Sequence, residues 1–467
     1  MSNQTASSTA NQHPVVSVLG AGVMGQGIAQ LSAQSGWRTL LYDLSFEACD
    51  KAFHNIEKAL QKRVDRGRLT AAEATNTMRR LEIVNDVEEL AESDLVIEAV
   101  VEDLGVKHRL IRTLEKHCRK DTLLCTNTSS LSVADIASVA HHPERIAGLH
   151  FFNPAPVMKL VEVIQAPCTS DEVVNRLCVL AREMGKIPVI AQDSPAFIVN
   201  RCARPFYSEP LTMLTEGLAD IPTLDQAIQD NAGTPLGPFE LMDLVGLDVN
   251  LKATTTVWCA FDNHPRFAPS SAVHGRVAKG QLGRKSGQGF YDYTGARDAR
   301  QTQDEPPEAA HSRILADKLA DTLPFQVAVS DGRLAQEAAG GAPLLWLDQN
   351  LVSWQRHPVI LACTGSGLSG AQFDEARHAA AALGVTLKLI ADRPGLVAQR
   401  LAIMLEREAT RVVAEGVAQS QDIDTALRYG LNFRAGPFSL NADIDDACAE
   451  RILTHLRADD DTGRYED

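Results

Sequence analysis

The 467-residue sequence lacks the features that mark several common classes of protein. Its nine cysteines are odd in number and scattered, and none forms a C-x-x-C pair, which argues against a disulfide framework and against a zinc site. No apolar run approaches the roughly 18 residues that a membrane span needs, and residues 1–12 lack the basic and apolar segments of a secretory signal. The sequence therefore predicts a soluble cytoplasmic protein with no membrane partner and no metal, whose residues 1–12 form a disordered tail.

Aromatic residues are scarce as well, at 5%, whereas hydrophobic residues make up 45% of the chain and charged residues 22%. These proportions are typical of a globular helical or α/β enzyme and exclude an intrinsically disordered chain. The formal net charge of −15 would repel a phosphate backbone, so nucleic acid is not an expected partner. The length predicts three or more domains, at roughly 100 to 200 residues each.

Strand and helix patterns alternate over residues 13–193. This region begins with a strand at 15–20, a helix at about 23–35 and a strand at 39–43. Such alternation predicts right-handed crossovers and a mostly parallel, Rossmann-like sheet. The β signal then ends, and residues 194–293 are predicted to form an all-helical domain. Further strands are expected at 94–101, 122–127, 146–152, 160–164 and 187–192.

The rest of the chain contains a repeat of the helical domain. Residues 294–311 are polar and predict a linker, and residues 312–391 predict a degenerate α/β segment. Aligning 193–241 with 392–440 without a gap gives 14 identities in 49 positions, where chance gives about three. Because fixed spacing over such a length is typical of internal repetition, residues 392–467 are predicted to be a second helical copy. The predicted fold class is therefore α/β, extended by two helical domains.

A glycine-rich motif follows the first strand. Gly20, Gly22 and Gly25 form G-x-G-x-x-G at the start of a helix, where the backbone can approach a pyrophosphate and the helix N-terminus attracts it. Asp43 closes the next strand, where a carboxylate accepts hydrogen bonds from an adenosine ribose and repels a 2′-phosphate. The motif predicts an NAD site rather than an NADP site. The alternative is a glycine-rich turn that only begins a helix.

A second G-x-G-x-x-G occurs at 365–370. The register of the repeat places it opposite 166–171, which is a late loop and not a first strand-to-helix turn. We therefore do not expect a second nucleotide site there.

His150, Glu162, Ser129 and Ser130 are candidates for chemistry. A histidine at the end of a strand with a carboxylate nearby suits proton transfer, because the carboxylate fixes the tautomer and stabilises the imidazolium. From spacing alone, a structural histidine is the alternative for His150.

Seven sequence blocks follow one another over residues 15–293. They are, in order, GAGVMGQGIA, EAVVEDLGVK, TNTSSLSV, AGLHFFNPAPVMKLVEVI, DSPAFIVNR, GTPLGPFELMDLVGLD and GRKSGQGFYDY. In these blocks the chain resembles the 3-hydroxyacyl-CoA dehydrogenase family. The long form, with a second helical copy, resembles bacterial members linked to 3-hydroxybutyryl-CoA and 3-hydroxyadipyl-CoA oxidation.

The resemblance implies a role for each matching residue. His150 is the catalytic base, Glu162 orients it, and Ser129 and Asn200 contact the 3-oxygen and thioester region of the substrate. The residues implied for NAD binding are Gly20, Gly22, Val23, Met24, Gly25, Asp43, Glu102, Lys107, Asn153 and Lys285.

Basic side chains on the helix after Asp43 are candidates for CoA binding. Lys62, Arg63 and Arg66 stand roughly where family members offer basic side chains to the CoA nucleotide. A solvated helix face is the alternative.

The sequence departs from the family at a few positions. Ala196 stands where the family usually has glycine, and this change should be tolerated if φ is negative there. The second copy has the glycine, Gly395, but carries Gln399 opposite Asn200 and Gln349 opposite His150. The second copy is therefore predicted to be non-catalytic. Members of the family pair two chains through the helical domain, so the second copy is expected to pack on the first and imitate that contact within one chain. A homo-oligomer of the whole chain is a further possibility.

The resulting hypothesis is an NAD-dependent, reversible oxidation of a (3S)-3-hydroxyacyl-CoA to a 3-ketoacyl-CoA, in fatty-acid or phenylacetate-type degradation. One alternative is an NAD-dependent β-hydroxyacid dehydrogenase, although such enzymes usually rely on a catalytic lysine in the helical domain. Another is a catalytically inert NAD-binding protein of the same fold. The acyl-chain length and the presence of a terminal carboxylate do not follow from the sequence.

Overall fold

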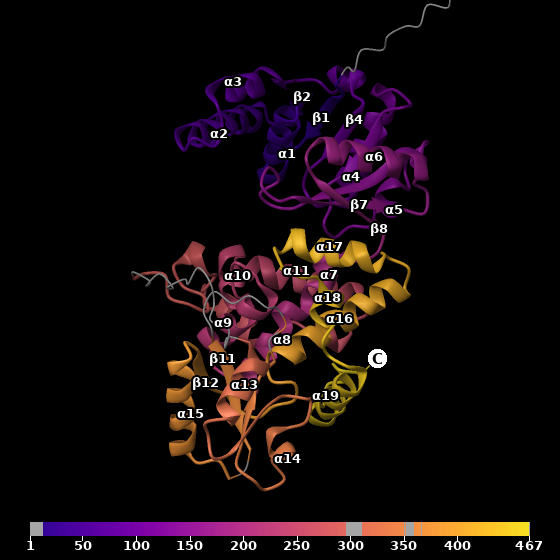
Figure 1. The fold of residues 1–467 in the computed structure, drawn as a ribbon. Helices are drawn as coiled ribbons and strands as arrows, with labels where there is room; N and C mark the ends of the chain where they lie inside the picture. The colour runs from indigo at the N-terminus through magenta and orange to yellow at the C-terminus, as the bar shows by residue number, and fades with distance from the viewer. Residues whose placement is uncertain (1–12, 296–310, 350, 352–358, 366, 467) are drawn as a thin grey trace, which may run out of the picture. The chain divides into compact units, whose positions relative to one another are not determined.

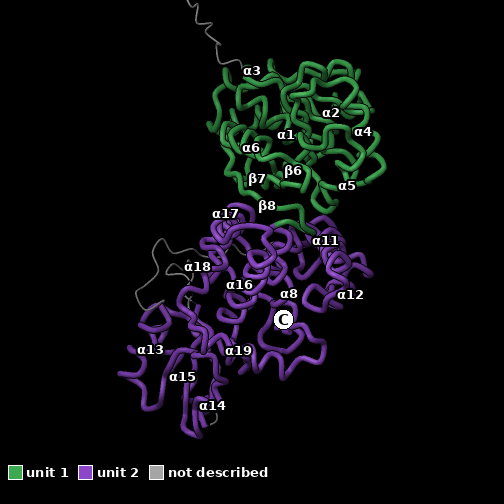
Figure 2. The backbone as a smooth tube through the Cα atoms, turned by 90° about the vertical axis from the view of Figure 1, so that its right-hand side faces the viewer, with its two compact units in different colours: residues 1–197 green, residues 198–467 purple. Residues whose placement is uncertain are grey.

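The computed structural model describes residues 13–295, 311–349, 351, 359–365 and 367–466 (Figure 1). The chain divides into two compact units, residues 1–197 and 198–467 (Figure 2). The expected tail lies outside the described residues, as do residues 296–310 of the expected linker. No helix of the described part is long and apolar enough to cross a membrane.

Unit 1 is built on an eight-stranded sheet with the order β3-β2-β1-β4-β5-β6-β7-β8. The first six strands are parallel, β7 is antiparallel to β6, and β8 is parallel to β7, so the predicted mostly parallel sheet is confirmed. The strands are β1 Val15–Leu19, β2 Arg38–Tyr42, β3 Leu81–Ile83, β4 Leu95–Glu98, β5 Leu123–Thr126, β6 Ile146–Phe151, β7 Leu160–Gln165 and β8 Ile187–Gln192.

Helices connect these strands and bury their apolar faces against the sheet. Val16 and Val18 of β1 pack in one core cluster with Ile28, Ile56 and Leu177 from three different helices. The helices are α1 Val23–Gln34, α2 Phe46–Asp65, α3 Ala71–Arg79, α4 Leu104–His117, α5 Val133–Ala137 and α6 Asp171–Glu183, with 3-10 turns η1 Val87–Glu92 and η2 Pro143–Arg145.

Unit 2 contains both helical copies. The first copy is built of helices, as predicted, and comprises α7 Val199–Cys202, α8 Arg204–Thr215, α9 Ile221–Ala232, α10 Pro238–Val245, α11 Leu247–Ala260, η3 Pro265–Phe267, α12 Ser271–Ala278 and η4 Arg284–Ser286. The second copy comprises α16 Ala398–Ala414, α17 Ser420–Gly430, α18 Pro437–Leu440 and α19 Asp446–Asp459.

A four-stranded sheet lies between the two copies in the chain. Its order is β12-β11-β10-β9, and its successive pairings are parallel, antiparallel and parallel, as they are for β5 to β8 of unit 1. Shifting β7 and α6 by 199 residues gives 359–364 and 370–382, the bounds of β11 and α15. The repeat therefore extends upstream of residue 392. The elements are α13 Ser312–Ala320, β9 Gln326–Val329, α14 Ala335–Ala339, β10 Leu344–Leu347, β11 Val359–Thr364, α15 Gly370–Ala382 and β12 Thr386–Leu389.

This correspondence also locates the second glycine motif. Ser369 of the motif caps α15, as Ser170 caps α6. Residues 367–369 thus precede α15, the counterpart of α6, late in the fold, which agrees with our expectation that the motif is not a first strand-to-helix turn.

The two helical copies contact each other through reciprocal ion pairs. Arg201 places its Nε 2.6 Å from Glu408 Oε1 and its Nη2 2.7 Å from Glu415 Oε1. Arg400, the counterpart of Arg201 199 residues later, places its Nε 3.0 Å from Glu209 Oε2 and its Nη1 2.6 Å from Glu216 Oε2. Both arginine side chains are fully buried. Each copy therefore supplies one arginine and two glutamates to the other.

Candidate active site

The turn between β1 and α1 requires glycine at two of its three motif positions. Gly20 has φ +100°, and a Cβ there would come within 2.5 Å of the Ala99 carbonyl oxygen. A Cβ on Gly25 would come within 1.7 Å of the Gly20 carbonyl oxygen, so helix and strand pack directly. A Cβ on Gly22 would meet no atom within 4 Å, which leaves open space at the helix N-terminus for a ligand.

The N-terminus of α1 is suited to bind a phosphate. Gly22 is its N-cap, no side chain caps it, and its first turn contains no acidic residue. The unpaired N–H groups and the helix dipole therefore remain available to an anion. Asp43 holds the adjacent loops in place, because its Oδ2 accepts from the Ala21 N–H at 2.8 Å and its Oδ1 from the Ser45 N–H at 3.0 Å.

Apolar side chains surround this turn and are exposed. Val23, Leu44, Phe46 and Val101 are 72%, 93%, 56% and 66% exposed, and each follows the end of β1, β2 or β4, which are neighbours in the sheet. Met24, beside Val23, is half-buried and packs against the core instead. The exposed group offers a surface for the flat ring of a dinucleotide. Sequence reasoning missed Leu44, Phe46 and Val101, although apolar residues directly after strand ends are a signal that could have found them.

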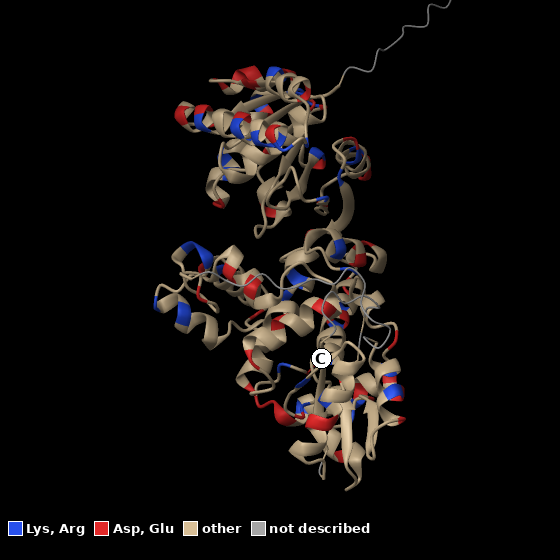
Figure 3. Ribbon diagram, turned by 60° about the vertical axis from the view of Figure 1, so that its left-hand side comes forward, with Lys and Arg blue, Asp and Glu red and all other residues tan. Residues whose placement is uncertain are grey.

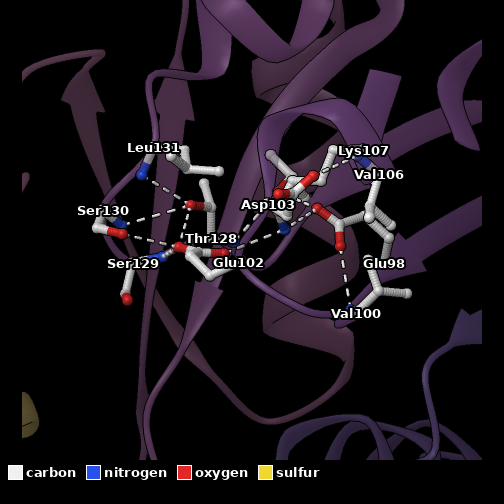
Figure 4. Close-up of polar contacts among 11 residues, drawn as sticks. Glu98, Val100, Glu102, Asp103, Val106, Lys107, Thr128, Ser129, Ser130 and Leu131 are labelled. Carbon is white, nitrogen blue, oxygen red and sulfur yellow. Dashed lines mark hydrogen bonds and ion pairs between the residues drawn. The ribbon is translucent and has the colours of Figure 1, made fainter. Parts of the chain in front are cut away.

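A network of carboxylates and hydroxyls follows β4 (Figure 4). Lys107 is 1% exposed, and its Nζ lies 2.6 Å from Glu98 Oε1 and 3.2 Å from Glu102 Oε2. Thr126 also donates to Glu98. Both residues predicted at this place, Glu102 and Lys107, therefore contact each other, and sequence reasoning missed Glu98, the buried carboxylate that holds the lysine.

Glu102 also fixes the loop after β5 (Figure 4). Its Oε1 accepts from Thr128 Oγ1 at 2.6 Å, from the Ser129 N–H at 3.1 Å and from Ser130 Oγ at 3.0 Å. Burial alone would raise the pKa of Glu102, but the hydrogen bond from Thr128 and the charge of Lys107 outweigh it, so the pKa lies below its ordinary value. An ionised Glu102 thus ties the loop that presents the exposed Ser129 to the end of β4.

His150 and Glu162 form a buried pair on adjacent strands. They are direct partners in the antiparallel register of β6 and β7, and His150 Nδ1 lies 2.6 Å from Glu162 Oε2. Glu162 is fully buried and His150 nearly so. A carboxylate on Nδ1 leaves Nε2 as the nitrogen that can exchange a proton with a ligand.

Two aromatic rings and an amide position the histidine. The ring centroids of Phe152 and Phe197 lie 4.6 Å and 5.8 Å from that of His150. Asn127 Oδ1 accepts from the Phe151 N–H at 2.8 Å and so anchors the end of β6. Asn153 follows β6 and is exposed. The arrangement can perform general acid–base chemistry at one imidazole nitrogen.

The other predicted site residues lie elsewhere in the chain. Asn200 and Lys285 belong to unit 2, where Asn200 lies on α7 and Lys285 Nζ contacts Asp248 Oδ1 at 2.5 Å. Lys62 and Arg66 are exposed at the C-terminal end of α2, and Lys62 is about 24 Å from Phe46 along the helix. Figure 3 shows acidic and basic residues interspersed along the helices of unit 1, so a solvated face remains the alternative for both.

The condition under which Ala196 should be tolerated, a negative φ, is not met. Its φ is +66°, and Phe197 follows with +49°, so two consecutive residues adopt the left-handed conformation. The second copy has the same backbone, with φ +68° at Gly395 and +46° at Leu396. Glycine adopts this conformation freely, whereas alanine is strained by about 1 kcal/mol or more.

The counterparts of His150 and Asn200 in the second copy contact each other. Gln399 Nε2 donates to Gln349 Oε1 at 2.8 Å, and Ser330 Oγ donates to Gln399 Oε1 at 2.8 Å. All three side chains are buried. Both ends of the Gln399 amide are therefore already engaged within the second copy.

Comparisons with known proteins identify the family of both parts of the chain. The family model of the 3-hydroxyacyl-CoA dehydrogenase NAD-binding domain matches residues 15–194. The model of the C-terminal domain of the same family matches residues 197–293 and again 395–467, so the second helical region is a copy of that domain.

Relatives cover nearly the whole chain. The chain is 41% identical to the 3-hydroxyadipyl-CoA dehydrogenase of Escherichia coli K12, over 95% of this chain and 93% of that protein. It is 39% identical to the human mitochondrial hydroxyacyl-coenzyme A dehydrogenase, over 62% of this chain and 96% of the relative. A crystal structure of an Escherichia coli 3-hydroxybutyryl-CoA dehydrogenase matches with TM-score 0.87 and 40% identity, covering 97% of this chain and 96% of that one. The chain therefore belongs to the 3-hydroxyacyl-CoA dehydrogenase family and is an NAD-dependent oxidoreductase.

Proposed function

We propose that the chain catalyses the reversible oxidation of a (3S)-3-hydroxyacyl-CoA to the 3-ketoacyl-CoA, with His150 as the base. The observation that carries the proposal is the buried contact of 2.6 Å between His150 Nδ1 and Glu162 Oε2. His150 Nε2 removes the proton of the 3-hydroxyl group, and Glu162 stabilises the imidazolium that results. Ser129 and Asn200 bind the oxygens of the substrate and hold it for this transfer.

The residues of unit 1 fit the cofactor. Bound NAD supplies the hydride acceptor for the reaction. Gly22 and the uncapped N-terminus of α1 would hold the pyrophosphate, and Asp43 would accept hydrogen bonds from the ribose hydroxyls. Glu102 and Lys107 are proposed to act by fixing the loop of Ser129, because Lys107 is buried beneath its two carboxylate partners.

The names of the relatives leave the acyl group open. One relative is named for 3-hydroxyadipyl-CoA and others, such as that of Bacillus subtilis, for 3-hydroxybutyryl-CoA. These substrates share the 3-hydroxyacyl thioester and differ in whether the acyl chain ends in a carboxylate. We propose a place in the oxidative degradation of fatty or aromatic acids, where either kind of thioester is oxidised.

We also propose that the second helical copy is a supporting element and not a second active site. The hydrogen bond from Gln399 Nε2 to Gln349 Oε1 and that from Ser330 Oγ to Gln399 Oε1 support this role, because they already engage these amides. The reciprocal pairs of Arg201 and Arg400 support an intrachain arrangement that imitates a symmetric dimer contact. In this arrangement the second copy covers a surface that the first copy alone would expose.

One assay separates the proposal from its alternatives. The full chain is mixed with NADH and acetoacetyl-CoA, and the loss of NADH absorbance is followed, with free acetoacetate as the control substrate. We expect turnover of the thioester and little turnover of the free acid. An inert NAD-binding protein would bind NADH without turnover. A β-hydroxyacid dehydrogenase would reduce the free acid at least as well as the thioester, and either result would contradict the proposal.

A further inference from the structure

A cavity of about 350 Å³ in unit 2 contains arginine side chains and no carboxylate. Its size is near the lower limit of sites for small molecules. In a chain of net charge −15, three arginines without an acidic lining residue are unusual. The lining comes from α8, α11, η3, α12 and the segment after α19. The charged lining residues are Arg204, Arg266 and Arg464, and Tyr207 and Thr254 lie among the uncharged polar ones.

Arg204 is the arginine of this cavity that lacks a carboxylate partner. It is 6% exposed, its Nε donates to the Asn200 carbonyl oxygen at 2.7 Å, and its Nη1 donates to Thr254 Oγ1 at 3.0 Å. Its guanidinium lies over the ring of Tyr207. Among the described residues no carboxylate forms an ion pair with it, and burial lowers its pKa. Since a guanidinium keeps its proton in proteins, a buried positive charge remains without a counter-charge.

The other two arginines of the cavity differ from Arg204. Arg266 Nε lies 3.1 Å from Glu408 Oε2, and Arg464 Nε lies 3.3 Å from Glu209 Oε1. However, the buried Nη2 of Arg464 has no hydrogen-bond partner. Buried polar groups are nearly always satisfied, so the unpaired Nη2 of Arg464, together with the charge of Arg204 that no carboxylate compensates, favours an anionic ligand in this cavity.

The position of Arg204 indicates which anion. It begins α8, whereas Asn200 lies on the preceding helix α7, and the hydrogen bond from Arg204 Nε to the Asn200 carbonyl oxygen makes the two residues neighbours. Between the polar groups, the cavity wall is apolar, with Leu211, Leu251 and Val273. A ligand with a short aliphatic chain that ends in a carboxylate matches both features, because the chain packs on the apolar wall and the carboxylate meets the guanidinium.

We propose that Arg204 binds the terminal carboxylate of a dicarboxylic 3-hydroxyacyl-CoA substrate. This inference rests on the proposed function, since Asn200 must contact the 3-oxygen or thioester region for Arg204 to meet the far end of the acyl chain. Arg204 is then a specificity-determining residue. A guanidinium can bind a carboxylate through two parallel hydrogen bonds, whereas a terminal methyl group leaves the buried charge unpaired.

The test compares two thioesters that differ at one end only. The kcat/KM for NADH-dependent reduction is measured with 3-oxoadipyl-CoA and with 3-oxohexanoyl-CoA, for the wild type and for Arg204→Met. We expect the ratio of the two values to favour 3-oxoadipyl-CoA in the wild type and to fall about 10- to 100-fold in the variant. Arg204→Lys keeps the positive charge but cannot form two parallel hydrogen bonds to a carboxylate, so it should give an intermediate ratio of the two kcat/KM values.

Arg266→Met is the matched control, because it removes an arginine of the same cavity that already has a carboxylate partner. Its ratio should stay within about threefold of the wild type. Thermal unfolding of each variant checks the fold. If Arg204→Met does not fold, Thr254→Val, which removes the acceptor of Arg204 Nη1, should lower the ratio in the same direction.

The outcomes separate the two proposals. Wild-type protein that reduces neither thioester would overturn the proposed reaction itself. Reduction of both thioesters with the same ratio in the wild type and in Arg204→Met would overturn only the assignment of Arg204. A third arm adds free adipate or inorganic phosphate. If either anion raises the melting temperature of the wild type but not of Arg204→Met, while the ratio is unchanged, the cavity binds a free anion and the assignment is overturned.

Discussion

Side-chain identity at a few positions distinguishes the two copies. His150 and Glu162 pair across β6 and β7. The residue 199 positions after His150 is Gln349, whose side-chain oxygen accepts a hydrogen bond from Gln399. An imidazole changes its charge near neutral pH, whereas a primary amide does not. The same backbone can therefore hold a proton-transfer site in one copy and a closed hydrogen-bond network in the other.

Replacing Glu162 tests how the carboxylate acts. In Glu162→Gln the imidazolium loses its stabilising charge while the fold keeps an isosteric side chain. We expect kcat to fall about 10- to 1000-fold, with KM for acetoacetyl-CoA and Kd for NADH nearly unchanged. Glu162→Asp should recover part of kcat. Equal losses in kcat and in NADH affinity would indicate a structural role and contradict this account.

The left-handed turn at residue 196 gives a matched pair of stability predictions. Ala196→Gly relieves a positive φ and should raise the free energy of unfolding by about 0.5 to 1 kcal/mol. Gly395→Ala should lower it by at least about 1 kcal/mol, because the added Cβ is strained and lies 3.0 Å from the Arg400 nitrogen. Denaturant titration of both variants measures the two effects. If Ala196→Gly lowered the free energy of unfolding and Gly395→Ala raised it, the positive φ would not be what favours glycine at this position.

At the scale of elements, the sequence predicted the parts that have strong local patterns. The β1–α1 turn followed from its glycines and the closing aspartate, and the candidate histidine followed from its place at the end of a strand. The three residues of β3 were too few to show a pattern. The correspondence of β9 to β12 with β5 to β8 was missed because pairing depends on backbone register, which persists where side-chain identity is lost. The contact of Lys107 with Glu98 could not be predicted either, because it depends on how α4 packs beside the end of β4 and not on a local sequence pattern.

Asp348 caps α16 from inside the protein and gives that helix a pH dependence. The carboxylate accepts from the Val397 and Ala398 N–H groups, and burial raises its pKa from 3.8 to about 7. The folded state thus holds a proton that the unfolded state releases near pH 4, so stability is lost as the pH rises towards about 7. Between about pH 4 and pH 7, the free energy of unfolding of the wild type should fall by on the order of 3 kcal/mol relative to that of Asp348→Asn. Urea titrations of both proteins at several pH values measure this difference. If the free energies of unfolding of the wild type and of Asp348→Asn changed equally with pH, the prediction would be wrong.

At the scale of the whole molecule, the duplication joins two helical copies within unit 2. Arg201 and Arg400 are fully buried, and each relies on glutamates of the other copy to compensate its charge. Removing one partner from such a pair leaves an uncompensated buried charge, which costs about 3 to 5 kcal/mol. Neither copy is therefore expected to tolerate the absence of the other.

Truncation tests this dependence. A chain that ends at Tyr293 lacks Glu408 and Glu415 and exposes Arg201 together with the apolar surface around it. We expect this shortened chain to dimerise or precipitate, and light scattering coupled to size-exclusion chromatography distinguishes these states from the full chain at equal concentration. A shortened chain that stays monomeric with an unchanged melting temperature would contradict the proposed intrachain pairing.

The central claim is that His150 is the base of a 3-hydroxyacyl-CoA dehydrogenase. The most direct test is the rate of NADH oxidation with acetoacetyl-CoA by His150→Gln, measured beside NADH binding to the same sample. The account predicts that turnover falls by about 100-fold or more while the Kd for NADH changes by less than about twofold. Turnover at the wild-type rate would contradict it.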